Sequence, residues 1–442
     1  MNQNDKNKRK NKTAVQKKHY YRIEFCLSSA MAVGSGQNIM TDKDILRNSI
    51  GEPYIPGTAL AGIYRTFFEN PDEYFGSLQD GNASEIVTYD AYLLTENPKI
   101  LTRDCVGLDQ YKTGIPGAKF DFEILEPGTK FVTYLEQNEY IPSSDQDGQE
   151  EETGRIKNAA DVIAAAWMQE RIVIGAKVAR GLGQVTDVQI YVREFDFSQP
   201  SDINAWIDFD LYRRDSWNEE WKLSETDIFG KEGGTDLSIS LVQKSPLTIR
   251  TYTTDIGDDV PDYKQTAYIR NGKEIPIIPG TSWAGAFRHH MEKMIRNPEK
   301  LKELFGSKSE NNRNMAGKKS AVMFCESEIR DAESKIVTRN AIDRFSGGTV
   351  DGALFTEKSC IGGNTLLKVR INEENVDEEC IKALVASIVD LDLGFLAVGG
   401  ETSVGHGIFG ITEITVNGSQ NLKMQKPEDT YQKLVSSLLD RH

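Results

Sequence analysis

Alternating apolar and polar residues predict a strand at the start of each half of the chain. The segments YYRIEFCLS (20–28) and LSISLVQ (237–243) follow the period of two that places neighbouring side chains on opposite faces. Helical spacing comes next: the apolar residues on one predicted helix face are Leu60, Ile63, Tyr64 and Phe67 in the first half, and Trp283, Phe287 and Met291 in the second. Further helices are predicted at 160–170 and 377–390, before closing strands at 185–193 and 409–416.

Three sequence blocks occur twice, in the same order. PYIPGTALAGIYRTFFE (53–69) corresponds to PIIPGTSWAGAFRHHME (276–292), and the segment 101–131 corresponds to 337–366. The third block, IGAKVARGLGQV (174–185), corresponds to VGGETSVGHGIF (398–409). Three blocks in one order indicate a tandem duplication of a single domain.

The order of elements in each half predicts the fold class. Strand, loop, helix, strand, long hairpin, strand, helix and strand is typical of an α+β domain with a ferredoxin-like, split βαβ layout. Three tryptophans between the halves (Trp206, Trp217 and Trp221) predict a packed connector rather than a loose linker. The predicted divisions are a disordered basic tail 1–19, a first domain 20–197, a connector 198–235, a second domain 236–418 and a C-terminal tail 419–442 that holds an amphipathic helix from 426.

Charge and cysteine usage narrow the setting. The net charge is −15, although residues 1–19 are strongly basic, so the body is an acidic protein. Such a body binds nucleic acid only through a local basic track or fixed backbone donors, because phosphate affinity rests on charge neutralisation. The five scattered cysteines form no CxxC pair, which fits a reducing cytoplasm and argues against structural zinc. With no long apolar stretch and a polar N-terminus, we expect a cytoplasmic protein without a membrane partner.

The repeated motifs resemble a known family. The pattern I-P-G-[ST]-x-x-x-G-x-x-R, then T-R-x-x-I-D-R-x-[ST]-G-x-x-x-x-G-A-L-F-x-E, then a late G-x-G turn is similar to the RAMP superfamily. More specifically, the chain resembles the backbone subunits of type III CRISPR effector complexes, here as a fused tandem pair as in type III-D-like systems. The resemblance covers about 20–197 and 236–418.

That resemblance implies a fold, partners and an activity. Each domain would be a ferredoxin-like or RRM-like palm with a protruding β-hairpin thumb, lined up along a guide RNA (crRNA) beside other type III CRISPR effector subunits. The thumbs would part nucleotides at regular intervals. A loop aspartate opposite each thumb would cut the target RNA with a divalent metal, Mg²⁺ or Mn²⁺.

The resemblance places the thumbs at 101–124 and 337–358. The second thumb matches the family motif at Thr338, Arg339, Ile342, Asp343, Arg344, Gly347, Gly348, Gly352, Ala353, Leu354, Phe355 and Glu357. The first keeps Thr102, Arg103, Asp109, Phe122 and Glu123, but has Tyr111 and Lys112 where the family often has an arginine and an aromatic residue. We therefore expect the first thumb to hold RNA differently. Arg103, Arg339 and Arg344 are predicted RNA contacts.

The cleaving aspartate is expected in the loop before each I-P-G motif. The spacing D-x-x-[IV]-x-R selects Asp42, with Asp44 as the close competitor. In the second half Asp262 is the best match, with Asp258 and Asp259 as substitutes. A single carboxylate suffices, since it can act as a base or hold a Mg²⁺ whose other ligands come from the substrate. The alternative is an ordinary turn or cap residue.

RNA-holding groups are predicted at three further features of each half. Thr58 and Thr281 are expected N-caps, and the helix starts at Gly57 and Gly280 offer N–H groups to a phosphate. Arg65 and Arg288, two turns along, could clamp phosphates or instead pair with nearby acids such as Glu69. The glycine turns could pass close to RNA or serve only as turns; their residues are Lys177, Arg180, Gly181 and Gly183 in the first half and Gly405 and Gly407 in the second, where Glu401 and Ser403 predict a weaker contact.

Two alternatives to RNA cleavage stay open. The chain could be a non-catalytic scaffold that spaces the crRNA and docks its neighbours. It could also be a crRNA-processing endoribonuclease that uses histidine. His289 and His290 are adjacent on a helix and therefore point to different faces, so we expect packing or RNA contacts from them, as from His406.

Overall fold

The computed structural model describes residues 14–34, 44–77, 83–108, 114–140, 159–223, 234–252, 260–270, 272–307, 319–372 and 376–439. The chain forms two compact units. The first comprises Met1–Leu101, Glu123–Ala176 and Gly183–Gly230, and the second comprises Thr102–Phe122, Lys177–Leu182 and Lys231–His442. Two segments from the first half of the sequence therefore belong to the second unit. The predicted domain limits follow the sequence repeat, whereas these units follow packing.

The first unit is built on one antiparallel sheet. Its strands are β1 (Val15–Leu27), β2 (Ile86–Thr88), β3 (Tyr92–Leu93), β6 (Lys130–Tyr140), β7 (Val185–Asp196) and β8 (Glu219–Glu220), and its helices are α1 (Gly57–Tyr64), α2 (Asp72–Phe75), α3 (Ala159–Met168) and α4 (Pro200–Ile207). The sheet order is β2-β6-β1-β7-β8, with β3 also paired to β6. The central β1 between β6 and β7 is the strand order of a ferredoxin-like fold, as predicted.

The two faces of this sheet are covered differently. Tyr21, Ile23 and Phe25 of β1 pack with Trp167 of α3 and Leu60 of α1 in the main core. This is the inward set that a period of two selects. Helices α1 and α3 therefore cover one face of the sheet.

The connector covers the opposite face. Tyr20 of β1 and Trp217 are both buried in a second apolar cluster. Trp206 of α4 donates to the hydroxyl of Tyr20 on this face (3.1 Å), whereas Trp221 packs against the main core on the first face and donates to Asp161 of α3 (2.8 Å). The predicted packing of the tryptophan-rich connector is confirmed for its described part.

The second unit repeats the arrangement with additions. Its strands are β9 (Thr235–Gln243), β10 (Arg250–Tyr252), β11 (Tyr263–Gln265), β12 (Ala267–Arg270), β13 (Lys273–Ile278), β14 (Val322–Phe324), β15 (Ser327–Arg330), β16 (Glu333–Ile342), β17 (Thr349–Ile361), β18 (Asn364–Ile371) and β19 (Phe409–Val416). Its helices are α5 (Gly280–Met291), α6 (Pro298–Phe305), α7 (Glu378–Leu393) and α8 (Pro427–Leu439). The main sheet has the order β12-β13-β15-β18-β9-β19. Strand β9 lies between β18 and β19, just as β1 lies between β6 and β7 in the first unit.

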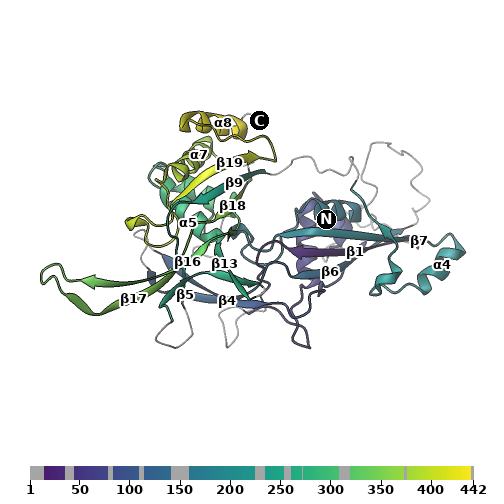
Figure 1. Cartoon of the computed structure of the whole chain (residues 1–442). Helices are drawn as coiled ribbons and strands as arrows, with labels where there is room; N and C mark the ends of the chain where they lie inside the picture. The colour runs from purple at the N-terminus through teal and green to yellow at the C-terminus, as the bar shows by residue number, and fades with distance from the viewer. Residues whose placement is uncertain are drawn as a thin grey trace, which may run out of the picture. The chain divides into compact units, whose positions relative to one another are not determined.

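Helices cover one face of the second sheet as well. Leu237, Ile239 and Leu241 of β9 are buried with Trp283 and Phe287 of α5. The C-terminal helix α8 lies on the outer side of α7 (Figure 1), and Leu434 and Leu438 join the same core. The predicted C-terminal amphipathic helix is confirmed.

Each half carries a long hairpin, as predicted, after the strand that follows its first helix. The first hairpin consists of β4 (Ile100–Leu108) and β5 (Gly114–Leu125), and the second consists of β16 and β17. Both extend slightly beyond the predicted 101–124 and 337–358. The second hairpin runs outward from the sheet with most of its residues exposed, as Figure 1 shows for β17. Asp109, Tyr111 and Lys112 lie outside the described residues.

One local prediction is wrong. Thr58 and Thr281 do not cap the helices, because α1 and α5 begin at Gly57 and Gly280 and their N-cap positions are Pro56 and Pro279. Neither helix start has a side-chain cap from its N-cap residue. Proline fixes its own φ and fits a helix start, so the I-P-G motif sets the first turn by backbone geometry. In the part of the chain that the structure describes, no helix has the length and apolar character to cross a membrane.

Candidate nucleic-acid interface

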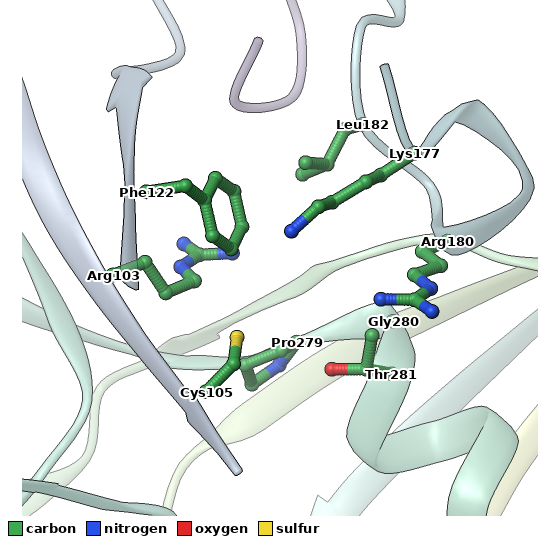
Figure 2. Close-up of a pocket in the computed structure, with 9 residues that line it drawn as sticks. All are labelled: Arg103, Cys105, Phe122, Lys177, Arg180, Leu182, Pro279, Gly280 and Thr281. Atoms are coloured by element: carbon green, nitrogen blue, oxygen red, sulfur yellow. The ribbon is translucent and has the colours of Figure 1, made fainter. Parts of the chain in front are cut away.

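A small basic pocket lies within the second unit, where residues from both halves of the sequence meet. Arg103, Cys105 and Phe122 come from the first hairpin, Lys177, Arg180 and Leu182 from the first glycine turn, and Pro279, Gly280 and Thr281 from the start of α5 (Figure 2). Its volume is about 20 Å³, which admits little more than a water molecule. The pocket can therefore take a phosphate oxygen at its mouth but cannot enclose a base.

Arg103 lines this pocket and is held by a buried ion pair. Its guanidinium donates to the carboxylate of Glu326, and the hydroxyl of Tyr268 donates to the same carboxylate. The exposed fractions of the Arg103 and Glu326 side chains are 12% and 4%. Burial raises the pKa of Glu326, while the Arg103 charge opposes that rise. Arg103, a predicted RNA contact, is thus committed to joining the first hairpin to the second unit.

Lys177 and Arg180 bring two further positive charges to this pocket; the Nζ atom of Lys177 is buried, whereas Arg180 is exposed. The Lys177 ammonium points from its turn towards the first hairpin (Figure 2), 3.2 Å from the ring centroid of Phe122 and 4.5 Å from that of Phe120. Arg180 is exposed at the end of the 3₁₀ turn η3 (Val178–Arg180). Burial raises the pKa of the Cys105 thiol, while the charges of Lys177, Arg103 and Arg180 act to lower it. The charges of all three cations therefore act on the Cys105 thiol, which lines the pocket.

The start of α5 adds backbone donors to this basic pocket. No acceptor is recorded for the N–H groups of Gly280 and Thr281 among the described residues, and α5 is twelve residues long. The start of α1 differs, because the N–H of Gly57 donates to the carboxylate of Asp90 (2.7 Å). The expectation of unpaired donors at both helix starts is therefore wrong for Gly57, where a side-chain carboxylate takes the place of an anion.

The matching residues of the second half form a closed ion cluster. Arg339, the counterpart of Arg103, pairs with Glu401 and donates to Nε2 of His406 (3.3 Å). Arg250 donates to the same Glu401 carboxylate (3.2 Å). Burial acts to raise the pKa of Glu401, but Arg339, Glu357 and His406 outweigh it and hold that pKa below its usual range. The second hairpin is therefore anchored by its own glycine turn.

The glycine turns show why glycine is needed at each position. A Cβ on Gly183 would lie 1.8 Å from the carbonyl oxygen of Ile174, and one on Gly407 would lie 1.9 Å from that of Val398. Both therefore serve packing inside their own turn. A Cβ on Gly181 would lie 2.5 Å from Cα of Cys325, whereas Gly405 has open space around it. Gly181 and Gly405 both have positive φ, 79° and 88°, so the two positions differ only in whether a Cβ would meet a neighbouring backbone.

The helix arginines pair with acids, as the alternative interpretation expected. Arg65 pairs with Asp72 and lies over the ring of Phe75, 5.8 Å from its centroid. Arg288 donates to Glu292 one turn later (3.3 Å). Both side chains remain partly exposed, so phosphate contacts stay a prediction for them.

The two candidate acids that the structure describes lie in different environments. Asp262 is exposed, and its Oδ2 accepts from the N–H of Thr356 on β17 (2.7 Å). The adjoining β11 pairs with β17, so this carboxylate is held at the base of the second hairpin. Asp44 is 5% exposed, which argues against direct contact with RNA. Asp42, Asp258 and Asp259 lie outside the described residues.

The tip of the second hairpin presents large apolar side chains to solvent. Phe345 is 87% exposed, Ile342 68% and Leu354 66%. The guanidinium of Arg344 lies 5.0 Å from the ring centroid of Phe345. The carboxylate of Asp343 accepts from the N–H groups of Phe345 and Ser346, and these bonds lower its pKa. The tip is an ordered turn that carries an exposed aromatic ring beside a cation.

Sequence reasoning missed several residues of the basic pocket. Cys105 shares a strand face with Arg103, since they are two residues apart in β4. The strand period of two could therefore have identified Cys105 as a neighbour of Arg103. Nothing local marked Glu326 and Tyr268 as partners of Arg103, because more than 160 residues separate them from it. The histidines do not form one site: His290 bonds to Asp390 (2.7 Å), and His289 faces Glu292.

The model of the RAMP superfamily matches residues 26–186 and 216–410. These two matches cover most of the chain and coincide with the two halves of the repeat. The chain belongs to the RAMP superfamily. No curated protein matches it.

One similar solved structure is that of the type III-B Cmr-beta complex bound to cognate target RNA, determined by cryo-electron microscopy. The sequence identity is 14% and the TM-score 0.30, over 42% of this chain and 61% of that chain. At that TM-score the likeness carries no argument. The assignment of two RAMP repeats is supported by the family match and by the strand order of both sheets.

Proposed function

We propose that the chain is a backbone subunit of a type III CRISPR effector complex that binds crRNA and cleaves complementary target RNA. The observation that carries this proposal is the second hairpin, which projects from a RAMP repeat and exposes Phe345 at its tip. A ring on an ordered projection can enter a base stack, because every base offers a face for stacking. A buried hairpin could not do this.

The basic pocket supports a role in holding the RNA backbone. Arg180 and the N–H groups at the start of α5 offer a phosphate positive charge and donors at one place, and Lys177 adds its charge from a buried position. The chain as a whole is acidic, so RNA affinity depends on such local sites. We assign direct phosphate contact to Arg180, because the guanidinium of Arg103 is already paired with the carboxylate of Glu326.

Asp262 supports the cleavage step in the second repeat. Its carboxylate is exposed and fixed against the hairpin that parts the nucleotides. Oδ1 has no recorded partner among the described residues, so it can accept a proton from a ribose 2′-OH or hold a cation. A bound Mg²⁺ would lower the pKa of that hydroxyl and offset phosphate charge. The described residues contain no group of three His, Cys, Asp or Glu side chains that could hold a metal, so RNA oxygens would complete its shell.

The test is a map of cleavage positions. The chain is reconstituted with crRNA and the other effector subunits, and a complementary target RNA is added with Mg²⁺. We expect cuts at regular intervals, with Asp42→Ala removing one cut and Asp262→Ala removing another. The cleavage rate at each affected position should fall by about 10²-fold or more, as expected for loss of a general base.

Asp351→Ala is the matched control, since Asp351 is an exposed acid on the second hairpin itself. Its cleavage pattern should equal that of the wild type. Persistence of every cut in the Asp42→Ala, Asp262→Ala double variant would reject both acids. RNA binding without any cut in the wild type would favour the scaffold.

One observation favours that non-catalytic scaffold for the second repeat. The Asp262 carboxylate already has a structural task, since it caps the N–H of Thr356 where the β16–β17 pairing continues. An Asp262→Asn variant separates the roles, because an amide oxygen can still accept that hydrogen bond but cannot act as a base. Loss of cutting with retained RNA binding identifies catalysis. The processing alternative loses support, because its histidines are held in separate ion pairs.

A further inference from the structure

Helix α4 of the connector exposes its apolar side. Pro200, Ile203, Trp206 and Ile207 recur at the spacing of three and four residues that places side chains on one helix face. Ile207 is 68% exposed, Ile203 39% and Trp206 37%, and Pro200 is exposed as well. These four residues form the α4 stripe. Figure 1 shows α4 beyond the end of β7, at an edge of the first unit.

The side of α4 that faces the first unit is made of a small residue. Ala205, on the opposite side of the helix from Ile203, packs against the second apolar cluster of the first unit. A helix that served only to cover the sheet would turn its isoleucines inward and its alanine outward. The isoleucines of α4 are therefore placed for a contact outside the first unit.

Helix α8 provides the reference, since it also follows the last strand of its repeat. Its Leu434 and Leu438 are 0% and 2% exposed and belong to the core of the second unit. The helix after the last strand thus buries its large apolar residues in the second repeat and exposes them in the first. The α4 stripe is a feature of the connector and not of the duplicated domain.

Trp206 is held in a fixed orientation within the stripe. Its indole N–H donates to the hydroxyl of Tyr20 (3.1 Å), and its ring meets that of Phe197 edge-on at a centroid distance of 5.3 Å. The ammonium of Lys18 lies 5.5 Å from the indole centroid. A fixed aromatic side chain loses little conformational entropy when it binds, which suits an anchor at the centre of an interface.

The connector around the stripe is acidic. Residues 196–220 hold seven acids and two arginines, and these arginines pair with Asp215 and Glu24. Asp208 is the C-cap residue of α4, directly after Ile207, and Asp210 is exposed two residues later. An acid at a helix C-terminus opposes the helix dipole, so Asp208 does not stabilise α4. Its charge is instead offered to a partner.

This charge selects among the possible occupants of the stripe. Nucleic acid and anionic membranes would be repelled by the acids, and a second copy of the chain would bring acid against acid. The basic segment 1–13 of the chain contains no apolar residue besides Met1, so it does not supply the apolar part of a partner. A cationic and apolar segment of another protein meets both requirements.

We propose that the α4 stripe docks an amphipathic helix of another protein, which carries apolar residues at helical spacing beside lysines or arginines. Ile203 and Ile207 contact its apolar side, with Trp206 as the anchor between them and the rim of the interface. Asp208 and Asp210 pair with its cations. Such docking uses the spacing of anchors by which helices are recognised on apolar surfaces. It does not depend on whether the chain binds or cuts RNA.

The test uses the full chain and a labelled synthetic helix of leucine and lysine at amphipathic spacing. Fluorescence anisotropy should show saturable binding that weakens in high salt. The double variant Ile203→Ser, Ile207→Ser should bind at least about tenfold more weakly, because it removes the apolar contact. Asp208→Asn should weaken binding about twofold and reduce its salt dependence. Hydrogen exchange of the complex should show protection over residues 200–208.

Ile50→Ser is the matched control, because Ile50 is a 75% exposed isoleucine elsewhere in the first unit, and it should bind as tightly as the wild type. A leucine–glutamate helix of the same spacing should not bind. Circular dichroism melting shows that each variant is folded. Equal binding by the double isoleucine variant, equal binding of the glutamate helix, or protection confined to other residues overturns the proposal.

Two further measurements examine the other occupants. Sedimentation velocity should find the wild-type chain free of self-association through α4, and phosphatidylglycerol vesicles should not bind it. Self-association or vesicle binding that the double isoleucine variant abolishes would assign the stripe to a second copy or to a membrane, and would overturn the proposal.

Discussion

The bases of the two hairpins differ although their motifs correspond. At the first base, Arg103 reaches a carboxylate supplied by the other half of the sequence, and both side chains are nearly buried. At the second base, Arg339 stays within its own repeat and is 31% exposed. Glu401 stands at the position that Lys177 has in the first glycine turn, and it supplies the carboxylate that pairs with Arg339. The two motif arginines therefore find acids in different parts of the sequence.

Removing the arginine should have its largest effect at the first base. Arg103→Ala leaves the Glu326 carboxylate buried without its cation, which costs about 3–5 kcal/mol. Arg339→Ala should cost about 1 kcal/mol or less, because the pair is more exposed and Arg250 remains on Glu401. Urea denaturation with hydrogen exchange read separately for the second unit measures the difference. Equal losses would contradict the comparison.

The loss in Arg103→Ala should also depend on pH. Burial already raises the pKa of Glu326, and without Arg103 it rises further. A carboxyl group with a raised folded pKa gives its full stability below its unfolded pKa and loses it as pH rises through the folded value. The deficit of the variant should therefore shrink in acid and grow towards neutral pH. Melting curves across that range check this sign, and a pH-independent deficit would reject it.

The glycine turns sharpen the same comparison. Gly181→Ala and Gly405→Ala both place a side chain at positive φ, at a cost of about 1–2 kcal/mol each. Only Gly181→Ala also drives a Cβ into the backbone of Cys325 and Phe324, which adds about 1–3 kcal/mol. The difference between the two melting temperatures isolates that packing.

The hairpin tips should differ in RNA binding by a smaller amount. Phe345→Ala removes one stacking ring and should weaken binding by about 1–3 kcal/mol. Val106, 52% exposed on the first hairpin, offers only a small apolar side chain, so Val106→Ala should cost well under about 1 kcal/mol. Filter binding of guide RNA at fixed salt gives both values. A larger loss for Val106→Ala would reverse the assignment of the stronger wedge.

Much of the architecture was predictable because its signals are local. A period of two marked β1 and β9, helical spacing marked α5, and the repeated blocks gave two RAMP repeats. The Thr58 and Thr281 caps were wrong because the preceding proline already sets the helix start. The basic pocket was predictable in part: Lys177, Arg180 and Gly280 are residue types that bind phosphate, and Phe122 matches the thumb motif, whereas nothing in the sequence marks Leu182.

The amino-acid sequence by itself determined the duplication, the strand order of each repeat and the presence of a hairpin in each, since periodicity and repeated motifs act over short distances. Only the tertiary structure decided which charges meet. Arg103 and Arg339 occupy the same motif position, yet one finds Glu326 and the other Glu401. Ion pairs depend on distances across the fold and on burial, and neither can be read from the spacing of residues along a chain.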